Sequence, residues 1–376
     1  MTDNVPFEAV ETAFRGFADV DPTYSAQVTV HVGGERVVDL VSGALDENSL
    51  VPVFSSSKGA TAIVVAMLVQ QGRLDLDATV ARYWPEFAAK GKDAITVRQL
   101  LSHQAGLPGV DGGFTIEEAW DHDALATRLA AQRPYWHPGA ACLYHGITIG
   151  TLADELVRRI DGRPVGVVFA DEVARPRGID GWLGLPASED ARVVDFLLPA
   201  AEDLAAGFSP PSNPDPIMAT ALPTGNPFAV LTRVNEERWR RAGQPASGML
   251  ASARGLAEMY TSLRHTVHGQ PRVLDDTTVA AMSQIQYAGR ELGSDLPVRF
   301  GVLFQVPCPP RWPFGGVGAF GHDGAGGSLA FCDPSLDISF GYTVQRLALP
   351  GGMDARAVQL ARLVRRAVRA RRSSTG

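Results

Sequence analysis

The chain has 376 residues, of which 45% are hydrophobic and 20% are charged. These proportions are close to those of average globular proteins and exclude a largely disordered chain. The formal net charge of -7 argues against a nucleic-acid partner, because a surface that binds phosphates has to be basic.

The N-terminus and the cysteines bear on the cellular compartment. Residues 1–6 have neither the basic start nor the apolar segment of a secretory signal, and the apolar run over 63–69 is too short to span a membrane. The cysteines are widely separated, and the eight histidines lack metal-ligand spacing. We therefore expect a cytoplasmic protein with reduced thiols, no metal or other cofactor, and no membrane partner. The cysteines are Cys142, Cys308 and Cys332.

The first predicted elements are a β-hairpin and a buried helix. Apolar and polar residues alternate over 28–32, Gly33-Gly34 supply a turn, and a second strand returns over 37–41. The following segment Ser55–Gln70 contains helix-forming alanines and is apolar on nearly all faces. A helix of this kind is expected to be buried on most sides.

Helices dominate the middle of the sequence, and strands return near its end. The predicted helices cover Thr96–Ser102, Ile116–Gln132 and Ile147–Ile160, and they alternate with loops such as the proline-rich Ser209–Pro216. Two strands are expected over 327–332 and 336–344, and a last helix carries apolar residues at helical spacing over 360–368. We expect this apolar stripe to pack on the sheet.

The order of strands, helices and strands predicts an α+β fold with two parts. Residues 1–73 and 241–376 are expected to form a discontinuous domain around a sheet. Residues 74–240 are expected to form a mainly helical domain.

The segment Ser55-Ser-Ser-Lys58 is the main candidate for chemistry. A serine hydroxyl needs a nearby base to act as a nucleophile, and residues three apart on a helix share a face. Lys58 is therefore expected to reach Ser55, and burial in an apolar helix makes its amine a usable base. The helix N-terminus also favours negative charge near Ser55.

Other interpretations of this segment stay open. Serine and lysine three apart occur by chance in many proteins, and Ser55 is then an ordinary helix N-cap. Ser56 and Ser57 are rival nucleophiles, although neither has a lysine three residues later. The stretch Ser57-Lys58-Gly59 also matches part of a G-x-S-x-G elbow, without its first glycine.

Three further segments support catalysis. Tyr144-His145-Gly146 precedes a predicted helix, and its tyrosine is a candidate to share a proton with Lys58, as a phenolate base or a relay. The glycine-rich stretch 320–328 lets backbone N–H groups approach a ligand closely, which suits an oxyanion hole. The third segment lies between Ser55 and Tyr144 in the sequence and reads Leu100-Leu-Ser-His-Gln-Ala-Gly-Leu-Pro108.

This ordered set of motifs, S-x-x-K, L-S-H-x-x-G-L-P, Y-x-x and H-x-G, resembles the superfamily of class C β-lactamases, D-alanyl-D-alanine peptidases and family VIII carboxylesterases. The resemblance spans nearly the whole chain. It implies an antiparallel sheet flanked by helices, built from both chain ends, with a helical region inserted between them. It also implies Ser55 as the acylated nucleophile, Lys58 as its partner base and Tyr144 as the tyrosine of the Y-x-N motif.

The resemblance assigns the remaining site residues as well. His322-Asp323-Gly324 correspond to the K-T-G strand of the family, and the backbone N–H groups of Ser55 and Ala325 would form the oxyanion hole. His145 and His322 are candidates to line the cleft together with Asp323 and Gly324. His103 is expected to order its loop rather than to take part in the chemistry.

The departures from the family motifs indicate the substrate. Gly146 replaces the asparagine of Y-x-N, which removes an amide that would hold a β-lactam or a peptide bond. His322 and Asp323 replace the lysine and threonine of K-T-G, and a neutral histidine beside an aspartate is a poor site for a carboxylate. The sequence therefore predicts a serine carboxylesterase for short, uncharged small-molecule esters. A β-lactamase or peptidase-like amide hydrolase and a non-catalytic binding homologue stay as alternatives.

Overall fold

The computed structural model describes residues 7–200, 202–204, 216–223 and 229–374. The predicted loop Ser209–Pro216 lies outside these residues except for Pro216, which begins helix α10 (Pro216–Thr220). Among the described helices, none is both long enough and apolar enough to cross a membrane.

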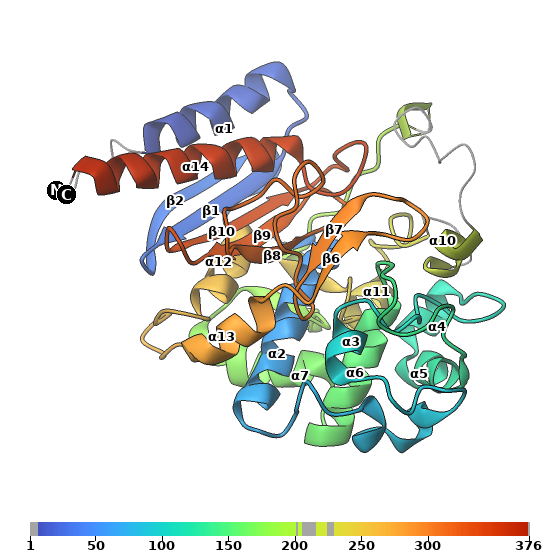
Figure 1. The fold of residues 1–376 in the computed structure, drawn as a ribbon. Coiled ribbons are helices and arrows are strands. Elements are labelled where there is room, and N and C mark those ends of the chain that lie inside the picture. Colours follow the sequence, from blue (N-terminus) through green and yellow to red (C-terminus); the bar gives the residue numbers. More distant parts are fainter. Residues whose placement is uncertain (1–6, 201, 205–215, 224–228, 375–376) are drawn as a thin grey trace.

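The central element is a five-stranded antiparallel sheet built from both ends of the chain (Figure 1). The predicted hairpin forms its first two strands, and the strands near the C-terminus complete it, with Val28 of β1 opposite Tyr342 of β10. The α+β fold with an antiparallel sheet is therefore confirmed. The strand order is β2 (Glu35–Ser42), β1 (Ala26–Val32), β10 (Ile338–Val344), β9 (Leu329–Asp333) and β8 (Phe320–Asp323).

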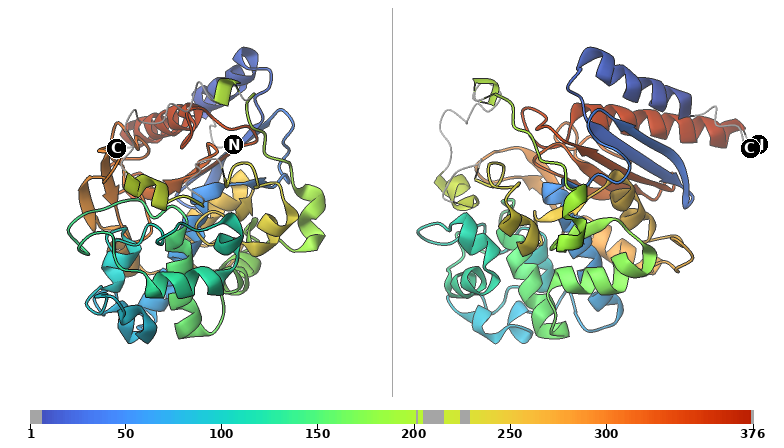
Figure 2. Two further views of the ribbon diagram at one scale, coloured as in Figure 1. Left: turned by 90° about the vertical axis from the view of Figure 1, so that its right-hand side faces the viewer. Right: turned by 180° about the vertical axis from the view of Figure 1, so that it is seen from behind.

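Side chains on alternate faces of this sheet enter two different cores, because successive residues of a strand point in opposite directions. On β9, Leu329 and Phe331 belong to the core beneath α1 (Glu8–Val20) and α14 (Ala355–Ser374). Ala330 and Cys332 belong to the core on the other face, where α12 (Ala253–Thr261) packs. Figures 1 and 2 show α1 and α14 lying side by side on their face of the sheet. The apolar stripe of the last helix packs there as predicted.

The segment that carries Ser55 begins with a 3₁₀ turn, Phe54–Ser57, and continues as α2 (Lys58–Gln70). The sequence predicts an α-helix from Ser55, which is wrong by three residues. Phe54 has a φ of 48°, a left-handed conformation that an α-helix does not contain. The burial of α2 is confirmed, because every residue from Lys58 to Leu68 is buried.

Helices of the mainly helical region pack against α2 (Figure 1). The predicted helix over 116–132 is two helices, because the Asp121 side chain accepts a hydrogen bond from the Ala124 N–H at 3.2 Å and caps the second one. The helices of this region are α3 (Val97–Leu101), α4 (Ile116–Trp120), α5 (His122–Ala131), α6 (Thr148–Asp161), α7 (Val165–Val168), α8 (Arg175–Arg177) and α11 (Glu237–Ala242). Helix α13 (Asp276–Ser283) packs on α2 from the C-terminal part of the chain.

A small three-stranded sheet connects the two parts of the chain just before Ser55. Its order is β3 (Val51–Pro52), β5 (Met249–Ala251) and β4 (Gly181–Leu183). Strand β4 belongs to the segment 74–240, so this segment contributes to a sheet that its mainly helical character does not predict. A separate hairpin of β6 (Tyr287–Arg290) and β7 (Pro297–Phe300) follows later in the chain.

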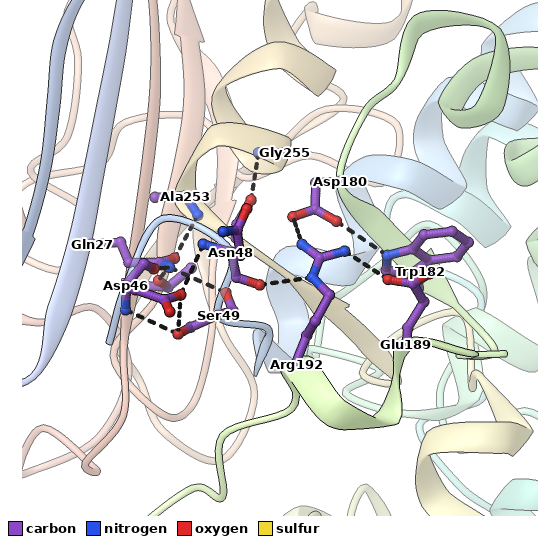
Figure 3. Close-up of polar contacts among 12 residues, drawn as sticks. Gln27, Asp46, Asn48, Ser49, Asp180, Trp182, Glu189, Arg192, Ala253 and Gly255 are labelled. Atoms are coloured by element: carbon purple, nitrogen blue, oxygen red, sulfur yellow. Dashed lines mark hydrogen bonds and ion pairs between the residues drawn. The ribbon is translucent and has the colours of Figure 1, made fainter. Parts of the chain in front are cut away.

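Polar contacts hold the loop in front of β3 between these parts (Figure 3). Arg192 donates from Nε to the Asn48 carbonyl at 2.9 Å and forms ion pairs with Asp180 and Glu189. On the other side, the Gln27 amide of β1 donates to the Ser49 carbonyl at 3.1 Å. The chain that enters the Ser55 turn is therefore fixed from both directions.

Candidate active site

Ser55 lies on the 3₁₀ turn between β3 and α2 and faces a cavity of about 360 Å³. The positive φ of Phe54 immediately before it is a strained conformation that aims the Ser55 side chain out of the turn. The Phe54 ring is held by an edge-to-face contact with Phe196, with ring centroids 4.9 Å apart. Packing therefore maintains the strain.

The hydroxyls of the neighbouring Ser56 and Ser57 form hydrogen bonds away from the cavity. Ser56 is buried, and its Oγ lies 2.9 Å from Ser328 Oγ. Ser57 is also buried; its hydroxyl donates to the Phe54 carbonyl and accepts from the Met249 N–H. Neither side chain lines the cavity, so the geometry favours Ser55 over both rivals.

The Lys58 amine contacts the Ser55 hydroxyl from the interior. Its Nζ lies 3.1 Å from Ser55 Oγ and donates to the carbonyls of Gly146 at 2.8 Å and Ala246 at 2.9 Å. Lys58 is fully buried, and this burial lowers its pKa well below the usual value, against a smaller opposing effect of the Asp323 carboxylate. A neutral amine has two N–H groups for the two carbonyls and one lone pair. The lone pair then points at the Ser55 hydroxyl.

A second buried lysine shows why these partners matter. Lys92 Nζ donates to three carbonyls, of Ala89, Ala130 and Gln132, and a carbonyl can only accept. Three acceptors require all three protons of an ammonium group. Lys58 has only two carbonyl partners and a hydroxyl that is able to donate, so its surroundings allow the neutral base.

Tyr144 lines the same cavity and also contacts Ser55, with the Lys58 amine 4.8 Å from the centroid of its ring. Its hydroxyl donates to Ser55 Oγ at 2.9 Å, and its ring stacks on Phe300 with the planes 4° apart. Burial raises the pKa of the Tyr144 hydroxyl above its usual value. This shift disfavours the phenolate form that the sequence left open and favours a protonated tyrosine that relays or donates a proton.

A buried carboxylate fixes the backbone of Tyr144. Glu291, in the turn of the β6–β7 hairpin, accepts the Tyr144 N–H at 3.0 Å with one oxygen. Its other oxygen accepts from Arg311 at 2.6 Å, and the guanidinium group lies over the Trp312 ring. Arg311 and Trp312 line the cavity, as does Gln305. These three residues belong to no motif and lie in loops, so no sequence pattern points to them.

Strand β8 and the turn after it form another wall. Asp323 lines the cavity, and it accepts hydrogen bonds from the Gln305 amide at 2.7 Å and the Met353 N–H at 2.9 Å. Burial raises its pKa, although these hydrogen bonds and Arg311 oppose the shift. Gly324 packs so closely on Val53 and Ser328 that a Cβ atom would lie 2.3 Å from each of them. Only glycine fits there without displacement.

His322 and His145, predicted to line the cleft, are both buried and do not line the cavity. His322 Nδ1 lies 2.6 Å from the Asp323 carbonyl, and its Nε2 lies 3.4 Å from the Tyr144 hydroxyl. Burial, with Lys58 nearby, lowers the pKa of His322, so the ring is neutral. His145 uses both ring nitrogens, with Nε2 accepting from the Leu107 N–H at 3.0 Å. Neither side chain lines this cavity, and their expected contact with substrate stays a prediction.

His103 orders its loop, as the sequence indicates. Its Nδ1 accepts from the His145 N–H at 3.0 Å, and its ring packs against the rings of Tyr144 and Phe300. A φ of 65° places its backbone in the left-handed region. The His103 ring therefore forms part of the packing that supports the Tyr144 ring.

The two N–H groups expected in the oxyanion hole lie on adjacent walls of the cavity. Ser55 is the second residue of a 3₁₀ turn, where a backbone N–H has no partner within the turn. Ala325 is exposed and occupies the second position of a turn closed by the Gly327 N–H on the Gly324 carbonyl, at 3.0 Å. An N–H in that position is not used by the turn itself. Among the described residues, no group of three or more His, Cys, Asp or Glu side chains is arranged to hold a metal ion.

The chain is similar to esterases over most of its length. It is 32% identical to an esterase/beta-lactamase, LipL of Mycobacterium tuberculosis, over 89% of this chain and 81% of that protein. The structure of EstA from Arthrobacter nitroguajacolicus superposes with a TM-score of 0.89 and 38% identity, covering 97% of each chain. A family VIII carboxylesterase superposes with a TM-score of 0.86 and 32% identity, covering 96% of this chain and 97% of that one.

The family model described as Beta-lactamase matches residues 10–364. The match includes every residue of the site described above, which confirms the resemblance seen in the motifs. The chain belongs to the beta-lactamase family.

Proposed function

We propose that the protein is a serine carboxylesterase that hydrolyses short, uncharged esters through an acyl-enzyme on Ser55. The observation that carries the proposal is the pair of contacts at Ser55 Oγ, with Lys58 Nζ at 3.1 Å and the Tyr144 hydroxyl at 2.9 Å. A buried amine of lowered pKa supplies the base, and a protonated tyrosine supplies a proton donor. The similarity to EstA and to a family VIII carboxylesterase supports ester chemistry.

In the proposed acylation step, Ser55 Oγ bonds to the ester carbonyl carbon while its proton passes to the Lys58 amine. The N–H groups of Ser55 and Ala325 stabilise the negative charge on the carbonyl oxygen. As the ester C–O bond breaks, the proton moves from Lys58 through Tyr144 to the departing alkoxide, which leaves as the alcohol. Water then attacks the acyl carbon, gives its proton to Lys58, and the proton returns to Ser55 Oγ as the acid leaves.

The cavity supports the proposed substrate class. Its volume of about 360 Å³ is near the lower end of the range for ligand pockets, roughly 300–1,000 Å³, which suits a small ester. The positive charge of Arg311 is already paired with Glu291, whereas the described residues offer Asp323 no basic partner within ion-pair distance except the neutral ring of His322. A substrate carboxylate therefore gains little from Arg311 and is repelled by Asp323 in its ionised form.

Labelling with a fluorophosphonate tests the proposal. The wild-type protein should acquire one phosphonate on Ser55 and hydrolyse p-nitrophenyl butyrate, and Ser55→Ala should lose both properties. Ser57→Ala is the control; it should still be labelled on Ser55 because its hydroxyl serves the turn. A phosphonate located by mass spectrometry on another residue would refute the assignment of Ser55.

Hydrolysis of β-lactams is a second candidate function, because the relative LipL is described as an esterase/beta-lactamase. The motif departures at Gly146 and Asp323 count against it. Comparing kcat/KM for p-nitrophenyl butyrate with kcat/KM for a chromogenic cephalosporin decides between the two. A labelled protein that turns over neither substrate would instead favour the non-catalytic homologue.

A further inference from the structure

Two backbone carbonyls orient the Lys58 amine, and they belong to segments a hundred positions apart in the sequence. Gly146 precedes α6, and Ala246 follows α11. A backbone carbonyl does not by itself stay at hydrogen-bond distance from a buried amine. The two segments have to be held in register, and a second side chain besides Lys58 forms hydrogen bonds with both.

That side chain is Gln244, which is buried and 5% exposed. Its Nε2 donates to the Ile147 carbonyl at 3.0 Å, one residue beyond Gly146. Its Oε1 accepts from the Ala246 N–H at 2.6 Å, on the same residue whose carbonyl contacts Lys58. One primary amide thus bridges the two segments that carry the partners of the lysine.

The residues around this bridge are packed closely against it. A Cβ atom on Gly150, in the first turn of α6, would lie 2.5 Å from the Ala246 nitrogen and 2.8 Å from Gln244 Nε2. The Thr61 hydroxyl of α2 donates to the Pro245 carbonyl at 2.7 Å and ties the same segment to the helix of Lys58. Glycine at position 150 therefore permits the approach, and Gln244 fixes it.

We propose that Gln244 is a positioning residue for the catalytic base. It acts through the Gly146 and Ala246 carbonyls, which keep the Lys58 amine shielded from water and oriented toward Ser55. The inference rests on the proposed function. Without the bridge, the segments separate and water reaches Nζ. Water solvates the ammonium form better than the protein interior does, so the pKa of Lys58 rises and less neutral amine is present at neutral pH.

The test measures the pH dependence of two reactions, hydrolysis of p-nitrophenyl butyrate and labelling of Ser55 by a fluorophosphonate. In Gln244→Leu, kcat at pH 7 should fall roughly tenfold to a hundredfold with little change in KM, as expected for a misplaced catalytic group. The acid limb of kcat/KM and of the labelling rate should move to higher pH, so that the deficit shrinks as the pH is raised. Gln244→Met keeps the length and neutrality of the side chain but loses both hydrogen bonds, so its acid limb should move in the same direction without a new charge near Lys58.

Gln132→Leu is the matched control. Gln132 is also a buried glutamine; it donates to the Arg133 carbonyl and accepts from the Asp111 N–H, both at 2.8 Å. It should lose comparable stability while its pH profile stays that of the wild type. If Gln244→Leu does not fold, Gln244→Met decides.

Two outcomes would overturn the inference, and they are distinguishable. In the first, the wild type is labelled on Ser55 while a Gln244 variant loses the same factor of activity at every pH, or loses none. That outcome refutes the positioning role alone. A wild type that carries the phosphonate on another residue refutes the proposed function, and the positioning role falls with it.

Discussion

The Gly146 carbonyl accepts a hydrogen bond from the Lys58 amine at 2.8 Å, at the position where the family motif Y-x-N has an asparagine. A backbone oxygen therefore supplies the contact to the base without a side chain. This arrangement orients the amine of the proposed base, and a Cβ atom on Gly146 would meet the Tyr144 ring and the Ala221 carbonyl only at ordinary van der Waals distances. Both consequences are testable.

The first prediction concerns the pH dependence of the reaction. Because burial lowers the pKa of Lys58, the active neutral amine should persist far below pH 10.5, the usual lysine value. kcat/KM should rise with pH along a single acid limb and then stay level, since the raised pKa of Tyr144 keeps its proton in place at alkaline pH. A pH–rate profile measures this, and an acid limb near the usual lysine pKa would contradict it.

The second prediction is that Lys58 and Tyr144 act as one unit on Ser55. Lys58→Ala and Tyr144→Phe should each lower kcat by about 10²-fold or more, because general acid–base groups contribute that much. The double mutant should lose much less than the product of the two factors, since removing either partner interrupts the same proton path. Losses that multiply fully would indicate independent roles.

The third prediction uses the space beside Gly146. A Cβ atom there would lie 3.6 Å from the Tyr144 ring, an ordinary van der Waals contact, so Gly146→Asn should fold. The added amide should raise kcat/KM for a chromogenic cephalosporin by about tenfold, the value of one hydrogen bond of roughly 1.4 kcal/mol, with little effect on p-nitrophenyl butyrate. Gly146→Ala is the control, because it fills the space without an amide. Equal gains in both variants would contradict the prediction.

The fourth prediction concerns charge selectivity in the cavity. Asp323→Asn removes a carboxylate from the wall and should raise kcat/KM for an ester with an anionic acyl group, relative to a neutral one, by roughly fivefold to tenfold above pH 7. Asp39→Asn, on β2 and paired with Arg254, should leave this ratio unchanged. An unchanged ratio in Asp323→Asn would remove Asp323 from substrate selection.

The fifth prediction concerns stability. His122 is mostly buried between Asp154 at 3.0 Å and Glu155 at 2.7 Å. Burial alone lowers the pKa of His122, but these two carboxylates outweigh it and raise the pKa to about 9, from 6.5. The protonated ring therefore stabilises the fold below pH 6.5, and this contribution, on the order of 3 kcal/mol, is lost as the pH rises through 9.

Thermal unfolding of His122→Gln across this range checks the fifth prediction. The difference in Tm between the wild type and the variant should be largest at pH 6 and smallest at pH 10. A difference that is constant with pH would show that the His122 ring is not protonated in the folded protein.

Sequence patterns alone predicted the family, which is confirmed, and proposed Ser55 as the nucleophile with Lys58 as its base. Ser55 and Lys58 are three residues apart at the start of a buried helix, so local geometry alone brings them together. Tyr144 was found because its motif has a fixed place in the order of motifs, although it contacts Ser55 across 89 positions. The hairpin and the last strands were predictable from the alternation of apolar and polar residues, because successive side chains of a strand lie on opposite faces of the sheet.

The surroundings of these groups depend on long-range packing. His145 and His322 have the residue type of a binding site, but burial removes both from the cavity, and no pattern of neighbours along the chain reveals that. Arg311 reaches the cavity from a loop whose path depends on long-range packing. The partners of Lys58 are backbone carbonyls, which every residue possesses, so the sequence carries no signal for them. Their positions follow from the packing of α2 against distant segments. That packing gives Lys58 two carbonyls and a hydroxyl, as the proposed base requires, whereas Lys92 has three carbonyl partners.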